Sequence, residues 1–182
     1  VVESLVATKQ KDGILGMCML MNKGLLYPYT PVERVPQMTA TNYNPSGGTP
    51  LYNKSVEVLA AVLAKCQEFE DNGIACRTIT GIFTDGGDTG YGRPPASDVK
   101  VLVDDMLRSE KHIVAGIGVK DGSIDFNAVF ESMGIPSQWI LTPQSSASDL
   151  RRAFGLLSQA AVRVSQSAGS FSKQAMGGFG SP

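Results

Sequence analysis

The sequence predicts an α/β fold in which a mostly parallel central sheet carries helices on both faces. Apolar segments of strand character alternate with helical segments along most of the 182 residues, which is typical of parallel sheets. The segment "HIVAGIGV" (112–119) is almost uniformly apolar, which predicts a strand buried on both faces. The turn "NKG" (22–24) is short enough to predict a hairpin, so one edge strand of the sheet should be antiparallel.

The first part of the chain predicts a helix and then this hairpin. Four apolar residues have helical spacing, and Gly13 ends the run: Val1, Val2, Leu5 and Val6. No N-cap residue precedes them, so we expect that the sequence begins inside a helix and that a strand lies upstream of it. Two strands follow at 14–21 and 25–30.

A long helix and a strand follow a polar loop. Thr49 is a suitable N-cap and Pro50 suits the first helical position. The helix should end at "DNG" (71–73). Residues 74–84 are rich in β-branched side chains and predict a strand, which carries Asp85 at its carboxyl end.

The rest of the chain predicts one more repetition of this pattern. We expect a helix at 97–110 with Ser97 as its cap, and then the apolar strand 112–119. A short helix near 125–134, a short strand in "QWILT" (138–142) and a final helix from about Ser148 complete residues 1–168 as one domain. Residues 169–182 are rich in Gly and Ser, so we expect this tail to fray.

Composition excludes several kinds of partner. Hydrophobic residues make up 42% and charged residues 18% of the chain, and the net charge is −1. This charge predicts neither nucleic-acid nor membrane-surface binding, and the apolar run "ILGMCMLM" (14–21) is too short to span a bilayer. The odd number of cysteines predicts buried reduced thiols and therefore a cytoplasmic location: Cys18, Cys66 and Cys76.

Three loops should meet at the carboxyl edge of the sheet, where open α/β sheets bind ligands. They are "SGGT" (46–49), "TDGGD" (84–88) and the loop after Val119. The Thr49 hydroxyl and the Asp85 carboxylate are oxygen donors that suit Mg²⁺ or Mn²⁺, with Ca²⁺ as a further candidate. Ser46 and Asp88 are candidates for the rim of a binding face. The alternatives are that Thr49 only caps its helix, that Asp85 only stabilises a turn, and that Ser46 and Asp88 are solvated loop residues.

The order of these motifs resembles the von Willebrand factor A domain. "GGTPLYN" (47–53) leads into a helix, and an apolar strand ends in "FTDGGD" (83–88). "HIVAGIGV" and "WILT" (139–142) match the last strands of that domain in order and spacing. The resemblance covers nearly the whole chain and is greatest to stand-alone bacterial proteins of stress and tellurium-resistance operons. It implies a three-layer, Rossmann-like fold.

The resemblance also implies a metal-ion-dependent adhesion site. In the family, an Asp-x-Ser-x-Ser motif after the first strand, a threonine and an aspartate hold the metal, and an acidic side chain of a protein partner completes its shell. Thr49 matches the threonine and Asp85 the aspartate. The Asp-x-Ser-x-Ser motif and its strand do not occur in residues 1–182, so we expect both upstream.

The predicted function is therefore metal-dependent protein binding without catalysis. A metal-free structural or self-assembling scaffold with a degenerate site is the alternative. A phosphoryl-transfer enzyme is less well supported, because Asp85 and Asp88 are three residues apart rather than two. "DGSIDFN" (121–127) has the oxygen spacing of a calcium loop but not its glycine, so it predicts helix capping.

Overall fold

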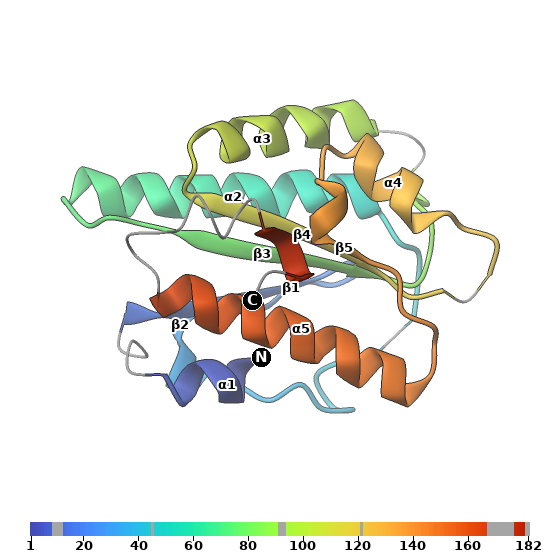
Figure 1. Ribbon diagram of the computed structural model, residues 1–182, viewed down its shortest axis with the longest axis horizontal. Coiled ribbons are helices and arrows are strands. Elements are labelled where there is room, and N and C mark those ends of the chain that lie inside the picture. Colours follow the sequence, from blue (N-terminus) through green and yellow to red (C-terminus); the bar gives the residue numbers. More distant parts are fainter. Residues whose placement is uncertain (9–12, 45, 91–93, 121, 167–176, 181–182) are drawn as a thin grey trace.

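The computed structural model describes every residue except 9–12, 45, 91–93, 121, 167–176 and 181–182. It is an α/β fold with a three-stranded parallel sheet in the order β3-β4-β5 and a separate two-stranded antiparallel sheet, β1-β2 (Figure 1). The predicted fold class is confirmed at this level. The prediction of one continuous sheet with a single antiparallel edge strand is wrong, because both hairpin strands lie outside the parallel sheet.

The hairpin consists of β1 (Leu15–Leu20) and β2 (Gly24–Pro31). Leu15 pairs with Pro31 and Leu20 pairs with Gly24, which has a φ of 80° and so closes the tight turn. No described residue forms a ladder between β1 and β3, so within the described chain each of these two strands has a neighbour on one side only.

The parallel sheet is built on β4 (His112–Gly118), all seven residues of which are buried, as the apolar run predicts. It pairs with β3 (Thr78–Thr84) from Thr78↔His112 to Thr84↔Gly118, and with β5 (Ile140–Leu141) on its other side. The strand β3 begins at Thr78, four residues later than expected. Ile74 is 54% exposed and its N–H bonds to the helix before it, so that segment belongs to a helix end.

Helices cover both sides of the sheets. Figure 1 shows α2 (Leu51–Asp71) and α3 (Ala96–Arg108) on one side, and α1 (Val2–Val6) and α5 (Ala147–Gln166) on the other. The short helix α4 (Phe126–Ser132) packs directly on β4, because a Cβ on Gly118 would lie 2.2 Å from Phe126 Cγ. Glycine in this strand therefore lets the helix approach the backbone.

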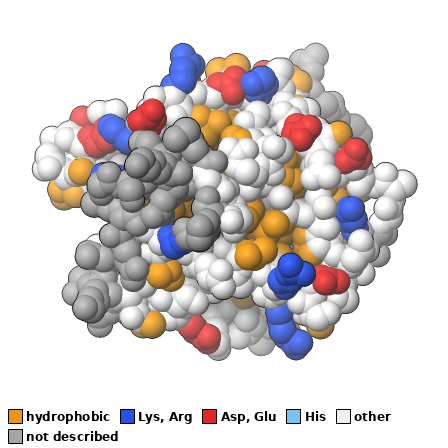
Figure 2. Space-filling view, in the orientation of Figure 1, with side chains coloured by type: hydrophobic (Ala, Val, Ile, Leu, Met, Phe, Trp, Pro, Cys, Tyr) orange, Lys and Arg blue, Asp and Glu red, His pale blue; other side chains and the backbone are white. Residues whose placement is uncertain are grey.

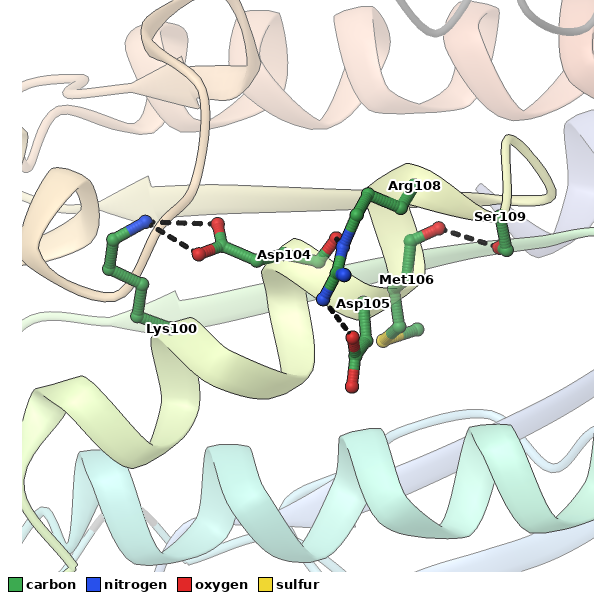
Figure 3. A network of polar contacts seen from close by, with 6 residues as sticks. All are labelled: Lys100, Asp104, Asp105, Met106, Arg108 and Ser109. Carbon is green, nitrogen blue, oxygen red and sulfur yellow. Dashed lines mark hydrogen bonds and ion pairs between the residues drawn. The ribbon is translucent and has the colours of Figure 1, made fainter.

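The outer face of α3 carries ion pairs, whereas its inner face anchors it. Lys100 pairs with Asp104 at 2.8 Å, and Arg108 pairs with Asp105 (Figure 3). Exposed pairs of this kind contribute little to stability. The side of α3 that faces the core is fully buried, and burial of its apolar area is the larger contribution: Val99, Val103 and Met106. The predicted cap Ser97 is wrong, since α3 starts at Ala96 with Pro95 in the N-cap position.

Both ends of the chain differ from expectation. The first helix stops at Val6, because Thr8 turns back and bonds to the carbonyl of Leu5 through both its N–H and its hydroxyl. The 3₁₀ turn Gly178–Gly180 lies in the tail predicted to fray, yet Phe179 is buried and its ring lies 5.0 Å from that of Trp139. That prediction is wrong for this turn, while residues 169–176 and 181–182 lie outside the described residues.

Further short elements complete the chain. A 3₁₀ turn at Val32–Arg34 precedes the loop to α2. Another, at Ser137–Trp139, leads directly into β5, so "QWILT" is a strand only at Ile140–Leu141. Asp125 caps α4 by accepting from the N–H of Ala128 at 3.2 Å, which confirms the capping interpretation of that motif. No helix of the described chain has the length and apolar character needed to cross a membrane.

Candidate metal site at the carboxyl edge of the parallel sheet

The three loops expected at the carboxyl edge of the sheet do meet there, on the right in Figure 1. The Thr89 N–H donates to the Thr49 carbonyl at 2.8 Å, which joins the loop before α2 to the loop after β3. The Val119 N–H donates to the Thr84 carbonyl at 2.8 Å, and a Cβ on Gly87 would touch Ile124 at 3.5 Å. The predicted convergence is therefore confirmed.

Glycines make the crossing of the first two loops this close. A Cβ on Gly48 would lie 2.7 Å from Thr89 Oγ1, and a Cβ on Gly86 would lie 3.0 Å from Thr49 Oγ1. Larger residues could not occupy these positions without moving the facing threonines. The second distance also shows that the Thr49 hydroxyl faces the backbone directly after Asp85.

Thr84 turns the chain at the end of β3. Its buried hydroxyl donates to the Gly86 carbonyl at 2.7 Å and accepts from the Gly86 N–H at 3.1 Å. A threonine hydroxyl that bonds two residues ahead closes a local turn. The intervening residue, Asp85, is consequently held on the surface, where it is exposed.

Asp88 caps α2 from a distant part of the sequence. Its Oδ1 accepts from the Tyr52 N–H at 3.3 Å and its Oδ2 accepts from the Gly90 N–H at 3.1 Å. The N-cap position of α2 is Pro50, which has no side-chain acceptor, so the prediction that Thr49 is the N-cap is wrong. An acidic side chain at a helix N-terminus is favourable because it satisfies a free N–H and the helix dipole.

Thr89 completes this clamp on the start of α2. Its hydroxyl accepts from the Thr49 N–H at 2.7 Å. Sequence reasoning missed both capping roles, because Asp88 and Thr89 lie 36 and 40 residues from the N–H groups that they accept from. A local capping motif would have been visible in the sequence, but a cap supplied across the fold gives no such signal.

The two predicted metal-binding side chains have no polar partner among the described residues. Neither the Asp85 carboxylate nor the Thr49 hydroxyl makes a hydrogen bond or ion pair with any described residue. Ser46, predicted at the rim, is exposed and bonds within the described chain only through its backbone N–H, to Asn44. The described residues contain no group of three or more His, Cys, Asp or Glu side chains that could hold a metal ion.

The oxygens present fit part of a shell for a hard cation. Mg²⁺ prefers about six oxygen ligands and commonly keeps several waters, so one carboxylate and one hydroxyl are a minor share of its ligands. Asp85 contributes the negative charge. The glycine-rich turn beside it leaves room for backbone carbonyls and water molecules as further ligands. The two side chains could therefore hold such a cation only together with further oxygen ligands.

A groove opens near the same edge, between the end of β5 and α5. It has a volume of about 320 Å³ and is lined mainly by apolar side chains, among them Leu141, Ala153 and Leu156. Asp149 and Arg152 line it as well. Figure 2, in the orientation of Figure 1, shows hydrophobic side chains exposed in the middle of the face in view.

Comparison with known proteins adds no assignment. No protein-family model matches the chain, and no curated protein and no solved structure matches it either.

Proposed function

We propose that this chain binds a protein partner through a divalent cation, Mg²⁺ or Mn²⁺, held in part by Thr49 and Asp85. The observation that carries the proposal is that some polar side chains where the loops cross are hydrogen-bonded within the fold, whereas two others are not bonded to any described residue. Thr84, Asp88 and Thr89 are each bonded within the fold. The Thr49 hydroxyl and the Asp85 carboxylate have no partner among the described residues. Open α/β sheets bind ligands at the carboxyl ends of their strands, which is where these two oxygens lie.

The surrounding residues fix the backbone that carries these two side chains. The turn at Thr84 fixes the direction of Asp85, and the bonds between Thr49 and Thr89 fix the start of α2 against the same loop. A cation bound there supplies positive charge that an acidic side chain of a partner can approach. The resemblance to the von Willebrand factor A domain supports this interpretation. It is also our reason for proposing a cytoplasmic role in a bacterial stress response.

Metal binding can be measured without knowing the partner. We would titrate Mn²⁺ into the full chain and follow the free ion by electron paramagnetic resonance. The wild type should remove Mn²⁺ from solution at one site, and excess Mg²⁺ should release it. Asp85→Ala and Thr49→Val should weaken binding about tenfold or more, because each removes one of few oxygen ligands.

A matched control separates the site from general negative charge. Glu131 is an exposed carboxylate on α4, and Glu131→Ala should bind Mn²⁺ as the wild type does. Equal binding by wild type and Asp85→Ala would overturn the proposal, and no binding by either protein would favour a metal-free scaffold. Metal-dependent hydrolysis of a phosphate ester that is lost in Asp85→Ala would contradict the proposal that the site binds without catalysing.

A further inference from the structure

Two thiols meet at the end of the parallel sheet opposite to Asp85. Cys66 lies on α2 and is buried, and Cys76 lies in the connection between α2 and β3 and is half-buried. The two Sγ atoms lie 2.6 Å apart, in direct contact. Cys76 precedes β3 and Asp85 follows it, so this pair is separate from the candidate metal site and does not depend on the proposed function.

The end of α2 explains why the two thiols face each other. The Ile74 N–H donates to the Phe69 carbonyl and the Gly73 N–H donates to the Glu70 carbonyl, both at 2.9 Å. These two bonds are a Schellman motif, and Gly73 has the positive φ of 74° that the motif requires. The chain consequently reverses against the last turns of the helix, which brings Cys76 back beside Cys66.

Polar groups from three elements surround the pair. The hydroxyl of Tyr29, on β2, is buried without a hydrogen-bond partner among the described residues. Burial, followed by the nearby Cys66 and Cys76, raises the pKa of Tyr29 to about 12. Lys111 and Glu70 form an ion pair of 2.6 Å, and both act electrostatically on Cys66. The cluster therefore contains polar groups from β2, from α2 and from the residue before β4.

We propose that Cys66 and Cys76 are a reversible thiol–disulfide modification site, oxidised by a small-molecule disulfide such as oxidised glutathione. Cys76 is the point of entry, because it is the more accessible of the two thiols. Burial is the main cause that raises the pKa of Cys66 to about 12. Burial therefore keeps Cys66 a protonated thiol, which leaves the first attack to Cys76.

The oxidation takes place in two successive thiol–disulfide exchange steps. The Cys76 thiolate attacks one sulfur of the small disulfide, forms a mixed disulfide and releases one small thiolate. Cys66 then loses its proton and attacks the Cys76 sulfur, which forms the Cys66–Cys76 bond and releases the second small thiolate. The two protein thiols lose two protons and two electrons, and the small disulfide is reduced to two thiols. The new bond joins the end of α2 to the start of β3.

The sequence offers a direct readout of this bond. Trypsin cleaves after Lys65 and after Arg77, so both cysteines fall in the one peptide 66–77. We would oxidise the folded full chain with oxidised glutathione, block free thiols with N-ethylmaleimide in denaturant, digest, and measure masses. Wild type and Cys18→Ser should yield peptide 66–77 without the blocking group and lighter by two hydrogen atoms. Cys66→Ser and Cys76→Ser should yield it with one blocking group or one glutathione.

A peptide control tests whether the fold brings the sulfurs together. The synthetic peptide 66–77 should need about tenfold less reduced glutathione to open its disulfide than the folded chain does, since folding holds the thiols in contact. Circular dichroism checks that each variant is folded. Peptide 66–77 carrying two blocking groups after oxidation, or a disulfide no more stable in the protein than in the peptide, would overturn the proposal.

Discussion

Replacing Asp88 by alanine should destabilise the protein, although Asp88 lies in a loop that was expected to line a binding face. The substitution removes both oxygens that accept from Tyr52 N–H and Gly90 N–H, at 3.3 and 3.1 Å. Loss of a helix cap costs about 0.5–2 kcal/mol, and hydrogen bonds to charged groups contribute about 1.5–3 kcal/mol. Because Asp88 is only half-buried, water can replace part of this, and we expect a loss of about 1–2 kcal/mol.

Urea unfolding followed by far-ultraviolet circular dichroism measures this loss. The midpoint should fall while the dependence on urea stays the same, which indicates a change of stability rather than of the unfolded state. Asp85→Ala is the matched control, three residues away, and should change the free energy of unfolding by no more than about 0.5 kcal/mol. If Asp88→Ala is as stable as the wild type, or if Asp85→Ala loses as much, the capping role is refuted.

Three further substitutions test the packing and the buried histidine. Gly118→Ala places a Cβ 2.2 Å from Phe126 Cγ and should cost about 1–3 kcal/mol in urea unfolding; a neutral effect would contradict the close contact between α4 and β4. Phe179→Ala should cost about 3 kcal/mol and shift the fluorescence of Trp139, the single tryptophan, whereas an unchanged spectrum would mean that the tail is not docked. Burial lowers the pKa of His112 below its ordinary value of 6.5. Protonation then favours the unfolded chain, so the free energy of unfolding should fall as the pH drops from 6.5 through the lowered pKa, and His112→Asn should remove that slope; an equal slope in both proteins would contradict this.

Local patterns predicted the elements that depend on local interactions. The apolar run 112–119 became the buried strand β4, and "DNG" ended α2 at the expected place. Capping of α4 by Asp125 was also visible, because donor and acceptor are three residues apart. Periodicity and short-range hydrogen bonds are both properties of neighbouring residues, so the sequence alone can show them.

Features that depend on distant contacts could not be predicted. The docking of Phe179 on Trp139 depends on a contact between residues that are far apart in the sequence, and glycine-rich composition around Phe179 favoured a frayed tail. We expected the hairpin to join the parallel sheet, but β1 and β2 form a sheet of their own. The order of strands along the chain does not determine which strands form hydrogen bonds with each other. Alternating strands and helices predict a class of fold rather than its ladders.

The candidate site, too, could be predicted from the sequence only in part. The convergence of the loops at 46–49 and 84–88 was expected, because open α/β sheets bind ligands at the carboxyl ends of their strands. The roles within those loops did not follow. Thr49 was predicted as a cap and is not one, because Asp88 reaches the helix from the other loop. Asp85 and Asp88 look alike in the sequence, and only their hydrogen bonds distinguish a capping residue from an available ligand.

The binding of a cation at Asp85 can be located most directly by nuclear magnetic resonance with Mn²⁺ as a paramagnetic probe. Substoichiometric Mn²⁺, added to the ¹⁵N-labelled chain, should broaden the amide signals of Thr49 and Gly86 first. The signals of Cys66 and Cys76, at the other end of β3, should stay sharp, and excess Mg²⁺ should restore the spectrum. Uniform broadening, broadening centred elsewhere, or the same pattern in Asp85→Ala would contradict a metal site at this edge of the sheet.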